Sequence, residues 1–118
     1  MTSAFAASYT LNRATKAAGK LMPKDGPAEF LLFNLPEPKA KPQDLLKYLR
    51  QAKENNAVLA IASPKVIYIR DLLADAMKIA EKEEFKGLYL IIIAEKTDAS
   101  AFAKIMEGRG VNIKYGVF

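Results

Sequence analysis

Polar side chains that suit phosphate binding follow two apolar runs of this sequence. Residues 57–62 and 88–94 are continuously apolar, and hydroxyl and lysine side chains come directly after each run. The candidate ligand-binding residues in these positions are Ser63, Lys65, Glu95, Lys96, Thr97 and Asp98. Hydroxyl groups beside helix N-termini bind phosphate because the backbone N–H groups and the helix dipole both favour an anion. The pattern therefore indicates a phosphorylated ligand as one candidate.

The same residues also have an ordinary structural explanation. Ser and Asp are frequent helix caps, and Lys and Glu are common in loops between strands and helices. Glu37 with Glu95 or Asp98 offers oxygen ligands for Mg²⁺. The glycines form no phosphate-binding motif between a strand and a helix, so no nucleotide site is indicated. The structural explanation is favoured, and no cofactor or metal is predicted.

Basic residues near the N-terminus form a second candidate site. Residues 1–24 contain Arg13, Lys16, Lys20 and Lys24 and no acidic residue, so they hold +4 of the formal net charge of +5. Arg13, Lys16 and Lys20 recur every three or four residues, which places them with Tyr9 on one face of a helix. Such a face suits a phosphate backbone and one stacked base. A solvated basic face, with the alanines packed on the sheet, is the favoured alternative.

The end of the chain is a candidate interface. Residues 111–118 alternate, with Val111, Ile113, Tyr115 and Val117 on one face and Asn112, Lys114 and Gly116 on the other. This period of two predicts a half-exposed edge strand. Its unpaired backbone groups predict pairing with a second copy or with a partner protein, and Phe118 would extend that interface. In the alternative, which is favoured, Phe118 folds back on the core. Proline at Lys114 would separate the two, provided that the N–H of Lys114 faces outward.

Composition narrows the chemistry that this chain can perform. The 118 residues are 51% hydrophobic and 26% charged, with no cysteine and no histidine. Disulfides, thiolate nucleophiles, imidazole bases and most zinc sites are thereby excluded. No apolar run approaches the roughly 18 residues that span a bilayer. We expect a soluble, cytoplasmic, single-domain protein with no membrane partner.

Four strands and three helices are predicted in the main part of the chain. The strands are at residues 29–33, 57–62, 88–94 and 111–118, and the third is central because both its faces are apolar. A helix at 43–55 begins with Pro42, and another at 99–107 is capped by Asp98. Pro36, Pro38 and Pro42 form either a stiff connection, which is favoured, or a ligand for a proline-reading domain.

In two segments the sequence allows more than one position for the start or end of a helix. Residues 63–84 form either one helix with Ser63 as N-cap and Pro64 at the first position, which is slightly favoured, or a strand at 66–70 followed by a helix from Asp71. The N-terminal helix is capped by Ser3 or by Asn12, and in the second case it ends at Gly19.

These elements predict an α/β fold. The expected architecture is a three-layer open sheet of four or five mostly parallel strands with helices on both faces, plus an N-terminal basic helix. Residues 1–26 form the basic arm or helix, and residues 27–118 form a single α/β domain. Ligands of such sheets bind outside the carboxyl ends of the strands, where the strand order reverses.

Function is predicted only by class. The absence of a recognisable catalytic group favours a non-enzymatic interaction module that docks on a protein, or on nucleic acid through the basic arm. The alternative is a small enzyme or sensor that binds a phosphorylated ligand at the strand ends. Self-association through the C-terminal strand is compatible with either function.

Overall fold

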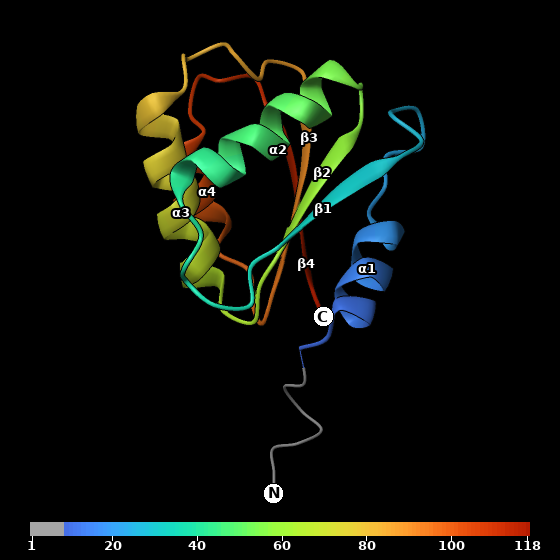
Figure 1. Ribbon diagram of the computed structural model, residues 1–118. Coiled ribbons are helices and arrows are strands. Elements are labelled where there is room, and N and C mark those ends of the chain that lie inside the picture. Colours follow the sequence, from blue (N-terminus) through green and yellow to red (C-terminus); the bar gives the residue numbers. More distant parts are fainter. Residues whose placement is uncertain (1–8) are drawn as a thin grey trace, which may run out of the picture.

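One parallel sheet forms the centre of the molecule. The computed structural model describes residues 9–118 (Figure 1). Its strands, in sheet order, are β1 (Phe30–Asn34), β2 (Val58–Ala62), β3 (Tyr89–Ala94) and β4 (Asn112–Val117). Every neighbouring pair is parallel. The predicted α/β sheet is therefore confirmed, with β2 and β3 inside it and β1 and β4 at its edges.

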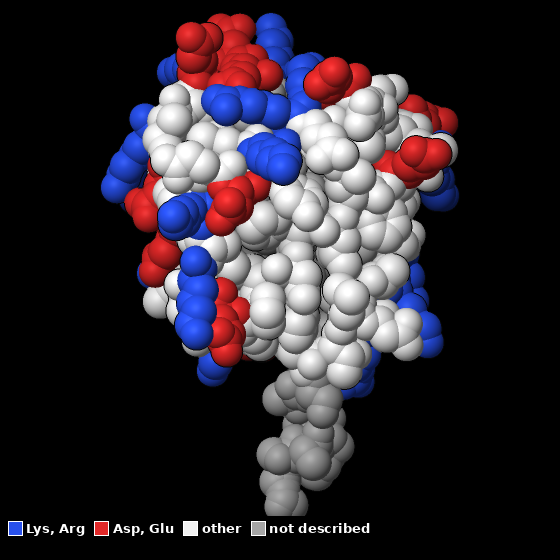
Figure 2. Space-filling view, viewed as in Figure 1, with Lys and Arg blue, Asp and Glu red and all other residues white. Residues whose placement is uncertain are grey.

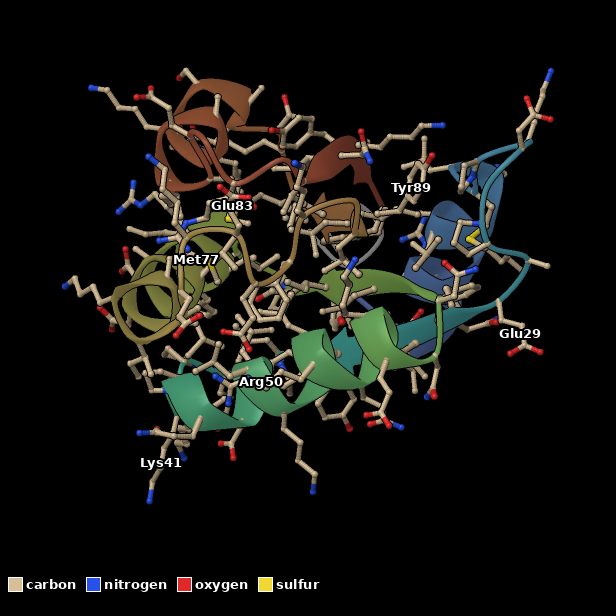
Figure 3. All side chains as sticks on the ribbon, turned by 90° about the horizontal axis from the view of Figure 1, so that it is seen from above. Glu29, Lys41, Arg50, Met77, Glu83 and Tyr89 are labelled. Carbon is tan, nitrogen blue, oxygen red and sulfur yellow. The ribbon has the colours of Figure 1, made fainter. Side chains whose placement is uncertain are left out.

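Helices cover both faces of this sheet. They are α1 (Leu11–Lys20), α2 (Pro42–Glu54), α3 (Val66–Ile79) and α4 (Ala99–Ile105). Seen from above, α1 lies alone on one side of the sheet, and the other three helices lie on the opposite side (Figure 3). The three layers agree with the prediction.

The strands follow one another in the sheet in the order in which they occur in the chain. All three crossover helices consequently lie on the same face, since successive right-handed crossovers in one direction add their helices to one side. Within the described residues the strand order never reverses. The crevice that a reversal creates, where the phosphate site was expected, is absent from this sheet.

Two apolar clusters hold the layers together. The larger lies between the sheet and α2, α3 and α4, and includes Phe85 and Phe102 among its largest buried side chains. The smaller lies between the sheet and α1, around Ala14, Ala18, Ile91 and Ile93. β2 is buried along its whole length because it receives apolar cover from both clusters. This is why its sequence is continuously apolar.

The ambiguous segment after β2 is one helix, which agrees with the slightly favoured of the two predictions. The predicted limits of this helix are wrong. Lys65, not Ser63, is the N-cap of α3, and Val66 is its first residue. Ser63 is fully buried and continues the sheet, because its backbone N–H donates to the Ile93 carbonyl over 3.0 Å. The helix ends at Ile79 and not at Glu84, since Ala80 has extended backbone angles.

Other helix ends differ from the predictions by a few residues. Thr10, not Asn12, caps α1, because its Oγ1 accepts the N–H of Arg13 over 3.1 Å; Ser3 lies outside the described residues. Pro42 begins α2 as predicted. Asp98 occupies the N-cap position of α4 without a side-chain capping bond. Among the described helices, none is both long and apolar enough to cross a membrane.

A basic groove between the first helix and the last strand

The basic face of α1 and the end of β4 meet at one groove of about 340 Å³. We call it the α1–β4 groove. Its lining residues are Arg13, Lys16, Ala17, Lys20, Leu21, Gly116, Val117 and Phe118. Two candidate sites that are almost a hundred residues apart in the sequence are thus brought together on one surface. The sequence offered no reason to join them, because the strand order was unknown.

Small residues bring α1 close to the sheet. Ala14 and Ala18 are completely buried on its inner side. On β4, a Cβ atom on Gly116 would lie 2.8 Å from Leu21 Cδ1 and 3.1 Å from Ile93 Cδ1. The glycine therefore lets the helix end pack against β4. With the alanines turned inward, the three basic residues of the helix lie on its exposed side. This packing fits a solvated face and a binding face alike, so nucleic-acid binding by these residues stays a prediction.

The charges around the groove are of one sign. None of the described side chains that line it is acidic. Lys114 lies two residues before Gly116, so its exposed side chain is on the same face of β4 as α1. On the side of the molecule where α1 lies, at the lower right of Figure 2, the visible charged side chains are all basic. Lys24 is exposed in the turn after α1 and is not part of the groove lining.

Phe118 lines the groove, and Tyr9 packs against it. The rings of Tyr9 and Phe118 meet edge to face, with centroids 5.2 Å apart. The Tyr9 hydroxyl donates to Asn34 Oδ1, and partial burial raises the pKa of this tyrosine. Tyr9 precedes α1 and helps to hold Phe118 against the smaller cluster. Phe118 therefore packs on the core, which is the favoured alternative, while it also lines the groove.

The outer side of β4 carries unpaired backbone groups. The N–H of Asn112 donates to the Leu88 carbonyl over 2.9 Å, and that of Phe118 donates to the Ala94 carbonyl over 3.4 Å. Because bonding direction alternates along a strand, the backbone groups of Ile113, Tyr115 and Val117 point away from the sheet. The N–H of Lys114 points toward β3. The proline test at Lys114 required this N–H to face outward, so proline at Lys114 cannot test edge pairing.

The predicted interface residues divide between the core and the surface. Val111, Ile113 and Tyr115 pack partly against the larger cluster, and the Tyr115 ring lies 6.0 Å from that of Phe102. Burial, and then the nearby charge of Asp98, raise the pKa of Tyr115. Val117 is 54% exposed. Only the last part of the strand thus offers an apolar side chain to a partner.

The candidate phosphate site at the strand ends is used by the fold itself. Glu95 Oε1 accepts the N–H of Val66 over 2.6 Å, so a carboxylate occupies the N-terminus of α3. Buried Ser63 accepts the N–H of Lys65 through its Oγ, over 3.3 Å. Lys65, Lys96 and Thr97 are exposed nearby. A phosphate at this helix end would face the Glu95 carboxylate, which repels it.

Acidic residues do not gather into a metal site in the part of the chain that the structure describes. Residues 9–118 contain no group of three acidic side chains that is close enough to hold an ion. Glu37, one of the residues considered for Mg²⁺, pairs with Lys39 at 3.1 Å on the exposed β1–α2 connection.

A second, smaller hollow was not foreseen from the sequence. It measures about 130 Å³ and lies between the β1–α2 connection and α3. Asp71 and Asp75 are at its rim, and they pair with Arg70 at 3.2 Å and with Lys78 at 3.3 Å. Because both carboxylates already have basic neighbours, this hollow lacks the one-signed charge of the α1–β4 groove.

Comparison with protein-family models, with curated proteins and with solved structures gives no significant match to this chain.

Proposed function

We propose that this protein is a non-enzymatic interaction module that binds an anionic macromolecular partner in the α1–β4 groove. The supporting observation is the lining of the groove: three basic side chains from α1 share it with an apolar floor that includes Phe118, and no acidic side chain is among the described lining residues. Basic groups attract carboxylates or phosphates, and the apolar floor adds area that is buried on binding.

The distribution of charge supports the same proposal. Residues 1–24 contain four basic residues and no acidic one, and the rest of the chain is nearly neutral. A local excess of positive charge steers an anionic partner to this part of the surface. Because the chain has no histidine or cysteine, binding is the simpler function. A cytoplasmic location belongs to this proposal and stays a prediction.

Two polyanions test the groove. Fluorescence anisotropy would measure the binding of labelled poly-glutamate and of a labelled single-stranded oligonucleotide to the protein at low salt. Replacing Lys16→Gln together with Lys20→Gln removes two charges from the groove, so we expect affinity to fall by at least about tenfold.

The matched control replaces Lys47→Gln together with Lys104→Gln. Both lysines are exposed, on α2 and α4, and neither lines the groove. This variant has the same net charge as the first, so it should keep affinity within about twofold if local charge decides binding. The proposal fails if neither polyanion binds, or if the two double variants weaken binding equally.

A further inference from the structure

We infer that the partner is an extended acidic segment of another protein, which adds to the open edge of β4 as a fifth strand beside α1. This inference rests on the proposed function, because it assigns a partner to the same groove. It combines the backbone of the strand with the charge of the helix, two features that meet at this edge of the sheet.

The backbone of β4 provides the first part of the argument. Ile113, Tyr115 and Val117 direct their N–H and C=O groups outward, as the bonds of Asn112 and Phe118 to β3 require. The strand contains no proline. An edge of this kind is a template for an added strand, whose main-chain hydrogen bonds supply affinity.

The side chains provide the second part. An added strand would lie about 4.8 Å from β4, and its alternate side chains would point to opposite faces of the sheet. On one face they would meet Lys16, Lys20 and Lys114, where carboxylates are favoured. On the other face they would lie beside Tyr115 and the 54% exposed Val117. The structure thus favours a segment in which acidic and apolar residues alternate.

Charge argues against a second copy of this chain as the occupant. Antiparallel pairing of two β4 edges about a two-fold axis would put both α1 helices on the same face of the joined sheet. The basic groove side chains of the two copies would then approach one another with Lys114 between them. Like charges at a paired edge destabilise it.

Ring geometry argues against nucleic acid. Single-stranded nucleic acids bind by stacking successive bases on aromatic faces. Phe118 is the only aromatic side chain among the described groove-lining residues, and Tyr9 already packs against it. A phosphate backbone also leaves the outward N–H and C=O groups of β4 largely unused. An acidic strand would place carboxylates beside the basic side chains and would also form hydrogen bonds with the outward backbone groups of β4.

A synthetic peptide tests strand addition on the intact protein. The probe is the labelled segment acetyl-Glu-Val-Glu-Thr-Glu-Val-Glu-amide, and its binding is measured by anisotropy. A series of peptides with one N-methylated backbone amide each should show a period of two: methylation of an amide that faces β4 should weaken binding by about tenfold, and methylation of the next amide should not.

Variants of the protein provide the matching test. Val117→Pro removes an outward N–H and no bond to β3, so we expect about a tenfold loss of peptide affinity. Val117→Ala keeps the N–H and serves as its control. If Val117→Pro does not fold, as judged by circular dichroism, the N-methylated series on the unchanged protein decides the question.

The outcomes separate this inference from the proposed function. Period-two loss with the peptides, together with weaker binding by the Lys16→Gln and Lys20→Gln variant, supports strand addition. If the peptide binds without periodicity, or if only the oligonucleotide binds the groove, strand addition is wrong while the anionic groove stands. If neither the peptide nor any polyanion binds, both proposals fail.

Discussion

Glu95 fits two interpretations of the sequence, a ligand-binding residue or an ordinary loop residue, but in the structure it binds the N-terminus of α3. It follows an apolar strand, where a ligand-binding carboxylate is expected, yet its Oε1 accepts the N–H of Val66, 29 positions earlier in the chain. The free N–H groups at a helix start attract a carboxylate. No local pattern could predict this bond, because it depends on β2 and β3 lying side by side.

Replacing Glu95→Gln should reveal this role. The amide keeps an oxygen acceptor but loses the charge that interacts with the helix dipole, so we expect the free energy of unfolding to fall by about 0.3–1 kcal/mol. Urea denaturation measures it. Glu29→Gln, at an exposed position before β1, is the control; an equal loss in both variants would contradict the capping role.

Glu84 gives a prediction for pH. Arg50 Nε lies 2.6 Å from Glu84 Oε2, and this hydrogen bond holds the pKa of Glu84 below its ordinary value of 4.5. The contribution of the pair is therefore fully present above that value and is lost as the pH falls through the lower, folded-state pKa. Arg50 is on α2, and Glu84 is in the loop that precedes β3.

Urea denaturation between neutral and acidic pH tests this assignment. Glu84→Gln should lose some stability at neutral pH and show a flatter decline on acidification than the unchanged protein. The effect should be small, because the Arg50 side chain is 52% exposed and solvent screens the pair. Glu54→Gln, also exposed on α2, should keep the original slope. Identical profiles for Glu84→Gln and the unchanged protein would exclude the pair as a source of pH dependence.

At the scale of elements, periodicity predicted most of the fold. The unbroken apolar runs of β2 and β3 indicated strands covered on both faces, and the alternation of residues 111–118 indicated an edge. The start of α3 was harder, because Val66 and Ile69 have strand propensity. Burial of Val66, Ile69, Leu73 and Met77 at helical spacing outweighs that preference, which amounts to tenths of a kcal/mol per residue.

The edge of β4 gives a prediction at this scale. Lys114→Pro removes an N–H that faces β3 and leaves its acceptor without a partner, so it should lower the free energy of unfolding by about 1–3 kcal/mol. Val117→Pro removes an outward N–H and should cost clearly less, since proline is tolerated on the open side of an edge strand. Chemical denaturation of both variants compares them directly. Equal losses would show that the bonding directions assigned to β4 are wrong.

At the scale of the whole molecule, sequence predicted where charge lies along the chain but not where it lies in space. The excess of basic residues near the N-terminus is evident from the sequence. The structure adds that these residues lie beside β4, because α1 packs there. That neighbourhood follows from the strand order, for which the sequence carries no direct signal. The α1–β4 groove was accordingly unforeseen, although the three basic residues predicted for one face of the helix are exposed, while Tyr9 is partly buried.

Salt should distinguish the groove from the rest of the basic segment. Poly-glutamate binding should weaken by about tenfold between roughly 50 mM and 500 mM salt, because the Debye length shortens over this range. The Lys16→Gln and Lys20→Gln variant should show a shallower dependence. Lys24→Gln should leave the dependence unchanged, since Lys24 is outside the groove lining. If Lys24→Gln flattens the curve as much as the double variant does, charge acts without regard to the groove.

The position of α1 also bears on the order in which the chain is made. It is the first described helix to be synthesised, but it packs mainly on β3 and β4, the last two strands. During synthesis the β1, β2 and β3 strands can pair in succession, because each lies beside the next in the chain. The inner side of α1 has no complete surface to cover until β4 is made. The binding groove is therefore a late product of folding, and a ribosome-bound chain that lacks residues 112–118 has no groove to offer a partner.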